Sequence, residues 1–232
     1  MTNALLQIKI KQRLNKLASL DYDNFQCWQI QEAFNKAQLE WVRRQVYGLN
    51  VRREGTEQTT GLIDDLRILM KSDDLKPVDK AMYAEATLPA DYLFYVRVDV
   101  LAKSECCPER RMTVYEVEEA NMGILLTSDD KKPSFEWAET LSTLVGETVR
   151  VYTNNEFDVT AVNLVYYRKP REVEFAGCVS PSTGAPITTD VTCEFKDDIA
   201  EILADETAAI LAGDIESMTQ YQRELQNGQR NS

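Results

Sequence analysis

The stretch AFNKAQLEWVRRQVYG, Ala33 to Gly48, has the most regular helical pattern in this chain of 232 residues. Its apolar positions continue a series that begins upstream, with spacings of three and four residues: Cys27, Ile30, Phe34, Ala37 and Trp41. This spacing places the side chains on one face of an α-helix. We predict a helix from about Asn24 to Gly48 whose apolar face packs in a core. Packing is preferred to a base-stacking role for its aromatic residues.

Three further helices are predicted around this one. Residues 1–20 carry leucine and isoleucine at helical spacing and are followed by the cap-rich sequence SLDYDN. A third helix is predicted from Thr59 to Met70. A closing helix is predicted from Glu194 toward Tyr221, because acidic residues crowd its first turns, where the helix dipole favours them.

The middle of the chain changes to a strand pattern. Tyr, Phe and Val alternate with charged residues after Pro89, and similar runs recur at 147–153 and 157–170. Asn154 and Asn155 tolerate left-handed backbone angles, so we predict that these last two strands form a hairpin. We expect further strand in 112–126, a short helix in 134–144 and a loop in 177–190.

These patterns predict an α+β protein with an amino-terminal helical bundle, a β-rich middle region and a long closing carboxy-terminal helix. The predicted divisions are residues 1–75 for the helical region and 76–194 for the β-rich region. Residues 195–232 form the closing helix, which packs back on the bundle, and a loose tail.

Charge is unevenly distributed along the chain. The formal net charge is −12, yet residues 1–53 carry nine Lys or Arg against four acidic residues. The remainder is strongly acidic and repels phosphate, so we expect no sequence-specific DNA binding by a broad basic surface. Two interpretations of the basic segment stay open, a patch for an acidic partner or the solvated faces of two helices.

The sequence offers little of the usual chemistry. It contains no histidine, which excludes His-based triads and His-metal clusters, and no glycine-rich phosphate loop. Five irregularly spaced cysteines lack the paired spacing of zinc sites and indicate free thiols in a reducing cytoplasm. We expect that the chain is not an enzyme, that it binds no cofactor and no metal, and that it has neither a signal peptide nor a membrane span.

Three pieces of the chain, taken in order, resemble the head-to-tail connector proteins of short-tailed phages, most of all the ring proteins of crAss-like phages. The first is EAFNKAQLEWVRRQVYG, with Asn35, Ala37, Gln38 and Glu40 in an Asn-x-Ala-Gln-x-Glu order. The second is ATLPADYLFYVRVDV, which is similar to the Leu-Pro-x-Asp-Tyr entry into the β-rich part. The third is the closing helix and tail, CEFKDDIAEILADETAAILAGDIESMTQYQ.

The resemblance implies a virion structural protein, made in the host cytoplasm and located in the neck of the virion. Its copies form a homo-oligomeric ring, usually twelve-fold, that contacts the portal protein and further tail or ring proteins. The ring extends the portal channel, seats the tail and lets DNA pass without sequence-specific binding. The polar side of the quoted helix and the tail are then candidates for subunit contacts: Asn35, Gln38, Glu40, Arg43, Arg44, Tyr221, Gln222 and Arg223.

Two rival functions remain. The chain could be a non-catalytic soluble adaptor or assembly chaperone that binds a partner through the Ala33 to Gly48 helix. It could also be a hydrolase that uses paired carboxylates, since acidic residues are plentiful, although no particular pair stands out.

Overall fold

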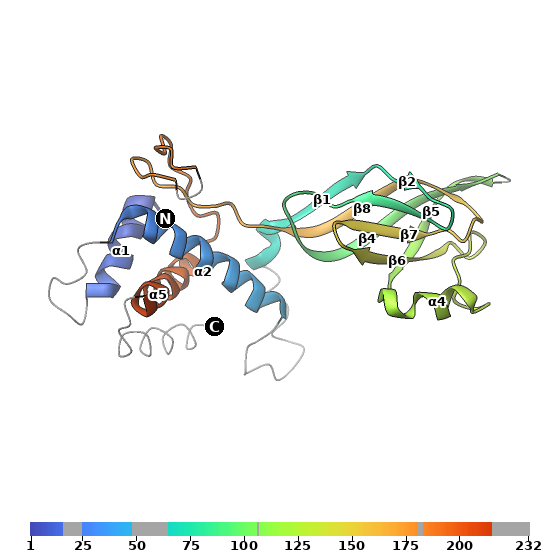
Figure 1. Cartoon of the computed structure of the whole chain (residues 1–232), viewed down its shortest axis with the longest axis horizontal. Coiled ribbons are helices and arrows are strands. Elements are labelled where there is room, and N and C mark those ends of the chain that lie inside the picture. Colours follow the sequence, from blue (N-terminus) through green and yellow to red (C-terminus); the bar gives the residue numbers. More distant parts are fainter. Residues whose placement is uncertain (16–24, 48–64, 106, 181–182, 215–232) are drawn as a thin grey trace. The chain divides into compact units, whose positions relative to one another are not determined.

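A computed structural model of the chain describes residues 1–15, 25–47, 65–105, 107–180 and 183–214 (Figure 1). The chain divides into two compact units. The helical unit comprises Met1–Ile68 and Pro170–Ser232, and the β unit comprises Leu69–Lys169. The β unit is therefore inserted between two segments that fold together.

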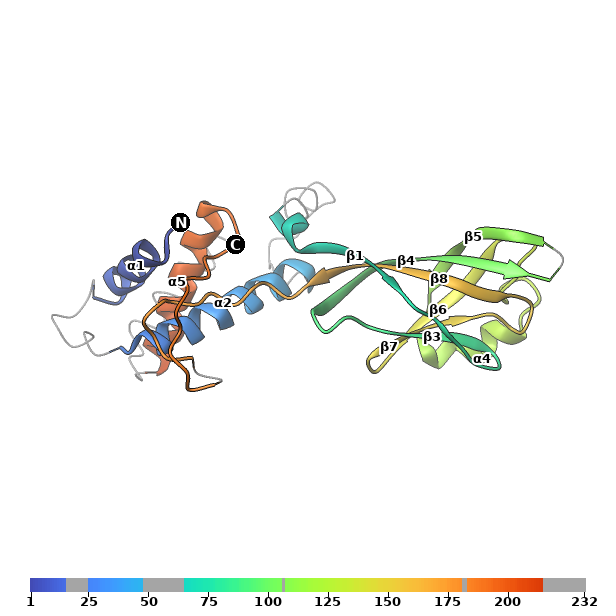
Figure 2. The same ribbon diagram turned by 90° about the horizontal axis from the view of Figure 1, so that it is seen from above.

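The helical unit contains α1 (Asn3–Asn15), α2 (Cys27–Tyr47) and α5 (Asp197–Asp214). Both α1 and α2 pack on α5, as Figure 2 shows. Phe34 is fully buried and Trp41 is 3% exposed, with its ring edge-on to Phe195 at a centroid distance of 5.2 Å. The apolar stripe of α2 is therefore core, as its spacing predicts, although Trp28 at its start is 39% exposed.

The third predicted helix lies mostly outside the described residues. Its end is helical at residues 65–66 and continues as the short 3-10 helix η1 (Arg67–Leu69). The prediction was wrong at Met70, which opens strand β1 (Met70–Leu75). The predicted path of the closing helix beyond 214 also lies outside the described residues.

The β unit is an eight-stranded curled sheet with one helix. After β1 come β2 (Val78–Asp79), β3 (Tyr83–Thr87), β4 (Tyr92–Ser104), β5 (Cys107–Glu116), α4 (Glu119–Thr127), β6 (Glu139–Val145), β7 (Thr148–Tyr152) and β8 (Asp158–Arg168). The strand order is β1-β8-β4-β5-β6-β7-β3-β2. All neighbours are antiparallel except β5 and β6, which are parallel.

Strand β5 joins the two halves of this sheet. Its residues up to Met112 pair with β4, and Thr113–Glu116 pair with β6. Side chains from β3 and β7 in one half and from β4 and β8 in the other half form a single apolar cluster, which includes Val98, Val151 and Leu164. The sheet therefore curls around one core. Its strands alternate apolar and polar side chains, and the curl buries the apolar face.

The predicted hairpin of residues 147–170 was wrong. Asn154 and Asn155 do have left-handed φ angles of 50° and 57°, as their residue types predict. However, the amide of Asn154 donates to the carbonyl of Met82 beside β3, and Phe157 enters the core at 5% exposure. The connection therefore arches across the core, so that β7 pairs with β3 and β6 while β8 pairs with β1 and β4.

Two other local predictions were wrong. Residues 119–127 form α4 instead of strand, because Met122, Leu125 and Leu126 lie at helical spacing and pack on the outer face of the sheet near Leu141. Residues 139–145 form β6 instead of a helix, because two strands flank this Thr- and Val-containing run and pair with it.

The boundaries of the compact units differ from the predicted divisions. The β unit begins at Leu69 and ends at Lys169, whereas the sequence divides the chain at 76 and 195. Residues 170–196 have few regular elements but belong with the helices. Among the described helices, none has the length and apolar character that a membrane span needs.

Candidate functional site

One polar stripe of α2 holds a neighbouring piece of the chain. We call residues 170–180 and 183–196, which lead from the β unit to α5, the return segment. Gln31, Asn35 and Gln38 lie on α2 at spacings of four and three residues, so their side chains share one face. Their amide groups all bind main-chain atoms of the return segment.

The contacts are regular. The amide N–H of Val173 donates to Asn35 Oδ1 at 2.8 Å, and Asn35 Nδ2 donates to the carbonyl of Val173 at 3.1 Å. On one side, the N–H of Phe175 donates to Gln31 Oε1 at 3.2 Å. On the other, Gln38 Nε2 donates to Asn35 Oδ1 at 3.0 Å and lies 3.5 Å from a return-segment carbonyl. Alternate residues of an extended chain are thus held by successive turns of α2.

This arrangement corrects one predicted interface residue. Gln38 is 1% exposed, so its side chain is enclosed by its own chain and does not face a neighbouring subunit. Asn35 is only partly buried, but both ends of its amide are used by Val173. The Asn-x-Ala-Gln order that marks α2 therefore binds the return segment, because an amide side chain can satisfy both main-chain groups of an extended residue.

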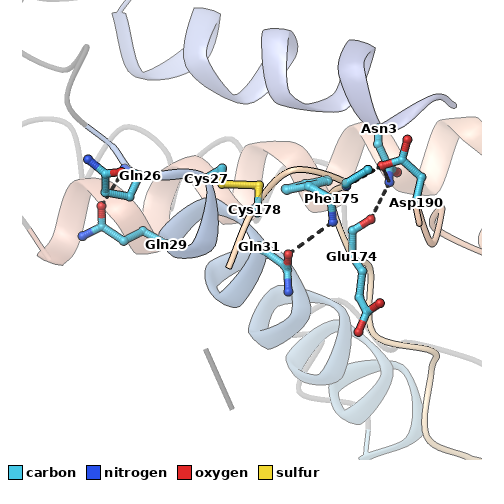
Figure 3. Close-up of a disulfide and its surroundings, with 10 residues drawn as sticks. Asn3, Gln26, Cys27, Gln29, Gln31, Glu174, Phe175, Cys178 and Asp190 are labelled. Carbon is cyan, nitrogen blue, oxygen red and sulfur yellow. Dashed lines mark hydrogen bonds between the residues drawn. A yellow bond between two sulfur atoms is a disulfide. The ribbon is translucent and has the colours of Figure 1, made fainter. Parts of the chain in front are cut away.

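The start of α1 holds the return segment as well (Figure 3). Asn3 Nδ2 donates to the carbonyl of Glu174 at 2.8 Å and lies 3.1 Å from Asp190 Oδ1. The backbone N–H of Ala176 donates to the same Asp190 oxygen at 2.9 Å. The Ala176 amide first, and Asn3 second, hold the pKa of the Asp190 carboxyl below its usual range. Asp190 therefore links residues 183–196 of the return segment to residues 170–180.

A disulfide joins the first residue of α2 to the return segment. Cys27 and Cys178 are bonded, with their Cα atoms 5.9 Å apart, a spacing that suits such a bond. The prediction of free thiols was therefore wrong for this pair, because residues 151 positions apart meet only through the tertiary fold. Among the described cysteines, Cys193 is a free thiol.

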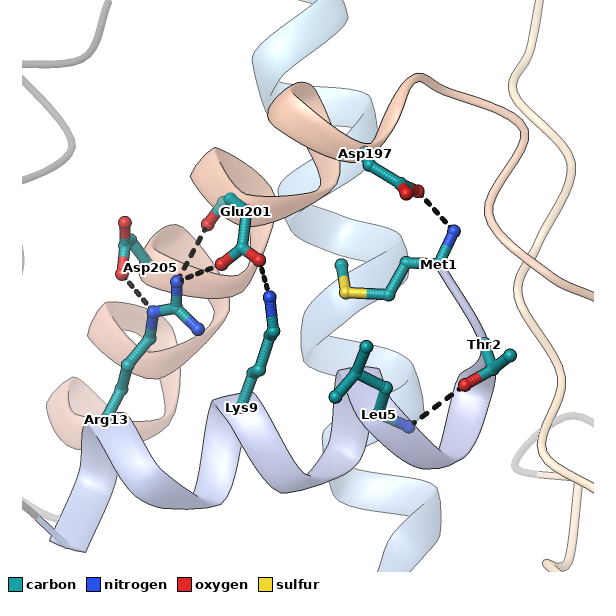
Figure 4. A network of polar contacts seen from close by, with 8 residues as sticks. All are labelled: Met1, Thr2, Leu5, Lys9, Arg13, Asp197, Glu201 and Asp205. Atoms are coloured by element: carbon teal, nitrogen blue, oxygen red, sulfur yellow. Dashed lines mark hydrogen bonds and ion pairs between the residues drawn. The ribbon is translucent and has the colours of Figure 1, made fainter.

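Lys9 and Arg13 of α1 pair with the acidic face of α5 (Figure 4). Lys9 contacts Glu201, and Arg13 contacts both Glu201, at 2.6 Å, and Asp205. The amino group of Met1 contacts Asp197 at the start of α5. These cations contact a complementary helix of the same chain. At these positions the basic segment is therefore neither a patch for an outside partner nor simply a solvated face.

The ion pairing extends to α2 through Arg44. Its guanidinium contacts Glu206, which is 7% exposed on α5. Burial raises the pKa of the Glu206 carboxyl, and the attraction of Arg44 offsets only part of this effect. Arg44 is therefore engaged within the chain.

Glu40 and Arg43 are exposed on α2 and stay candidates for contact with another subunit. Tyr221, Gln222 and Arg223 lie outside the described residues.

The two most exposed large apolar side chains of the described residues lie in the β unit. Trp137, in the turn before β6, is 77% exposed, and Ile124 of α4 is 73% exposed. Tyr115 of β5 is 49% exposed, and its hydroxyl lies 3.2 Å from Glu139. Tyr115 also lines a pocket of about 230 Å³ between the sheet and α4, together with Val117, Leu125, Asp130, Lys131, Lys132, Glu139, Thr140 and Leu141. Sequence reasoning missed this surface, because it predicted a helix around Trp137 and strand at Ile124.

The Leu-Pro-x-Asp-Tyr motif has a structural role at the entry to β4. The hydroxyl of the fully buried Tyr166 lies 2.7 Å from Asp91 and 2.8 Å from Asp73, and Lys71 Nζ lies 3.2 Å from Asp91. The carbonyl of Asp91 accepts from the amide of Lys169. Burial, and then the hydrogen bond to Asp91, raise the pKa of Tyr166. The motif therefore joins β1, β4 and β8 at one end of the sheet.

Comparisons with known proteins add no functional assignment. No protein-family model matches the chain, and no curated protein sequence matches it. In the described part of the chain, no group of three or more Cys, Asp or Glu residues is placed to hold a metal ion.

Proposed function

We propose that this protein is a virion structural protein, a subunit of the head-to-tail connector ring of a short-tailed phage. The observation that carries the proposal is the exposure of three large apolar side chains of the β unit, Tyr115, Ile124 and Trp137. Tryptophan and tyrosine are enriched at protein interfaces, where they lose contact with water at little entropic cost. A closed ring buries such a surface against a different surface of the next copy.

The charge of the chain supports the second part of the proposal, a channel through which DNA passes. The formal net charge is −12, and Lys9, Arg13 and Arg44 are paired with carboxylates of α5. Cations engaged in this way are less available to bind phosphates. A ring of such subunits repels DNA and lets it slide, in keeping with the resemblance of three sequence pieces to connector proteins.

The rival function as an adaptor that binds through α2 has less support. The apolar stripe of α2 is buried in the helical unit, and its polar stripe binds the return segment. The face of α2 that stays exposed is charged, with Lys36, Glu40 and Arg43, and lacks the apolar anchors with which a helix binds a groove. The hydrolase alternative has no specific contact in its favour, because the close carboxylates Asp73 and Asp91 are bridged by Lys71 and Tyr166.

The test is the mass of the assembled protein. Mass photometry of the purified 26.5 kDa chain, alone and with portal rings, is expected to show a high-order ring or its addition to the portal. Trp137→Ser and Ile124→Ser are expected to weaken assembly without a change in circular dichroism. Val78→Ser is the matched control, because Val78 is 58% exposed on β2, away from these residues in the strand order.

Two results together would overturn the proposal. They are a chain that stays monomeric with the portal and its absence from purified virions. Equal assembly of the Trp137→Ser, Ile124→Ser and Val78→Ser variants would remove the exposed surface from the proposed interface while leaving the ring itself to be explained by other contacts.

A further inference from the structure

The Cys27–Cys178 bond closes the end of the contact between α2 and the return segment. Along α2, Gln38, Asn35 and Gln31 bind main-chain groups of residues 171, 173 and 175 in turn. Cys27, four residues before Gln31, meets Cys178 as the next point in the same series. The disulfide therefore lies one helical turn beyond the last amide contact, after a turn in which the amide of Cys178 donates to the carbonyl of Phe175, and it joins the two segments covalently.

The chain beyond the disulfide turns back on itself. The amide of Gly177 donates to the carbonyl of Ile187 at 2.9 Å, and the amide of Ile187 donates to the carbonyl of Cys178 at 2.8 Å. Cys178 is 4% exposed and Ile187 is 8% exposed. Cys178 is thus the residue at which this turn is attached to α2.

We propose that the Cys27–Cys178 bond is a redox-controlled clasp that fixes the return segment on α2 after the chain has left a reducing cytoplasm. The thiols persist where small thiols keep cysteines reduced, and disulfides persist outside cells and at virion surfaces. The timing rests on the proposed function, since a virion protein is made in the cytoplasm and later leaves it. The existence of the clasp does not.

The reaction balances with a small-molecule disulfide as oxidant. The thiolate of one cysteine attacks a sulfur of that disulfide, forms a mixed disulfide and releases one small thiol. The second cysteine then attacks the protein sulfur of the mixed disulfide and releases the second small thiol. The two protein thiols lose two protons and two electrons, and the oxidant is reduced to two thiols.

The reduced protein remains folded, because the amide contacts of Gln31, Asn35 and Gln38 and the apolar core do not depend on the bond. Reduction releases only the far end of the series. The turn formed by 177–180 and 183–187 opens more often, and its amides exchange with solvent faster. The β unit does not respond, because both cysteines belong to the helical unit.

The first experiment traps thiols in the purified full chain after incubation in oxidised or reduced glutathione. Alkylation followed by peptide mass spectrometry is expected to show a 27–178 cross-link in the oxidised sample and two alkylated cysteines in the reduced one. Cys193, a free thiol of the same unit, is the internal control and should form no cross-link to another cysteine in either sample. Full alkylation of Cys27 and Cys178 after oxidation would overturn the proposal.

The second experiment measures amide hydrogen exchange in the two states. We expect at least a threefold faster exchange at 177–180 and 183–187 on reduction, with no change in Leu69–Lys169. Cys27→Ala should give the fast pattern in both states, while Cys193→Ser, a free thiol of the same unit, should keep the redox response. Identical exchange in oxidised and reduced wild-type protein would refute the clasp. If the exchange responds to reduction but the protein forms no ring, the clasp stands and only the proposed function is refuted.

Discussion

Asn35→Ala tests whether the polar stripe of α2 holds the return segment. The substitution removes both hydrogen bonds to Val173, at 2.8 and 3.1 Å, and the acceptor of Gln38. Val173 is fully buried, so water cannot replace the lost partners of its main chain. The change therefore leaves one buried N–H and one buried carbonyl without their partner.

The magnitude follows from these two groups. Each unpaired buried main-chain group costs about 1 to 3 kcal/mol. Alanine returns up to about 0.7 kcal/mol, because it is the better helix former in the interior of α2. We expect a net loss of about 1 to 5 kcal/mol in the free energy of unfolding.

The assay is urea unfolding followed by far-ultraviolet circular dichroism. The three long helices belong to the helical unit, so their signal reports on this unit more than on the β unit. Glu32→Ala is the control, because Glu32 is exposed on the same helix, and its change should stay within about 0.5 kcal/mol. If Asn35→Ala costs no more than this control, the stripe does not stabilise the return segment.

Three further predictions concern other contacts. Trp41→Ala should lower the free energy of unfolding by about 3 to 5 kcal/mol, as measured in urea, because its ring is 3% exposed and leaves a cavity. Glu206→Gln should remove one component of the pH dependence of stability. Because the pKa of Glu206 is raised above 4.5 in the folded state, wild-type protein gains stability below that pH and loses it as the pH rises through the raised pKa. Melting curves of both proteins between pH 4 and 8 should therefore converge toward the acid end, where the protonated Glu206 is neutral like Gln, and separate as the pH rises; curves that stay parallel contradict the raised pKa. Asp91→Asn should lower the pKa of Tyr166 in an ultraviolet titration and cost about 1 to 2 kcal/mol; an unchanged tyrosine titration contradicts the assigned hydrogen bond.

Periodicity along the sequence was enough to locate α1, α2 and α5 and to identify Phe34 and Trp41 as core. The residue types of Asn154 and Asn155 likewise predicted their left-handed backbone angles. Each of these properties depends on residues within a few positions of one another. The α+β class and the absence of histidine chemistry follow from the sequence in the same way.

The tertiary structure alone decided which distant segments meet. The turn at Asn154 leads into an arch instead of a hairpin, because Phe157 enters the core. Gln38 binds the return segment, and Cys27 bonds to Cys178. The residues near Gln38 and Cys27 in the sequence do not indicate either of these partners. Helical spacing shows that side chains share a face, but the partner of that face is chosen by packing and hydrogen bonding across more than a hundred residues, which no short window of sequence contains.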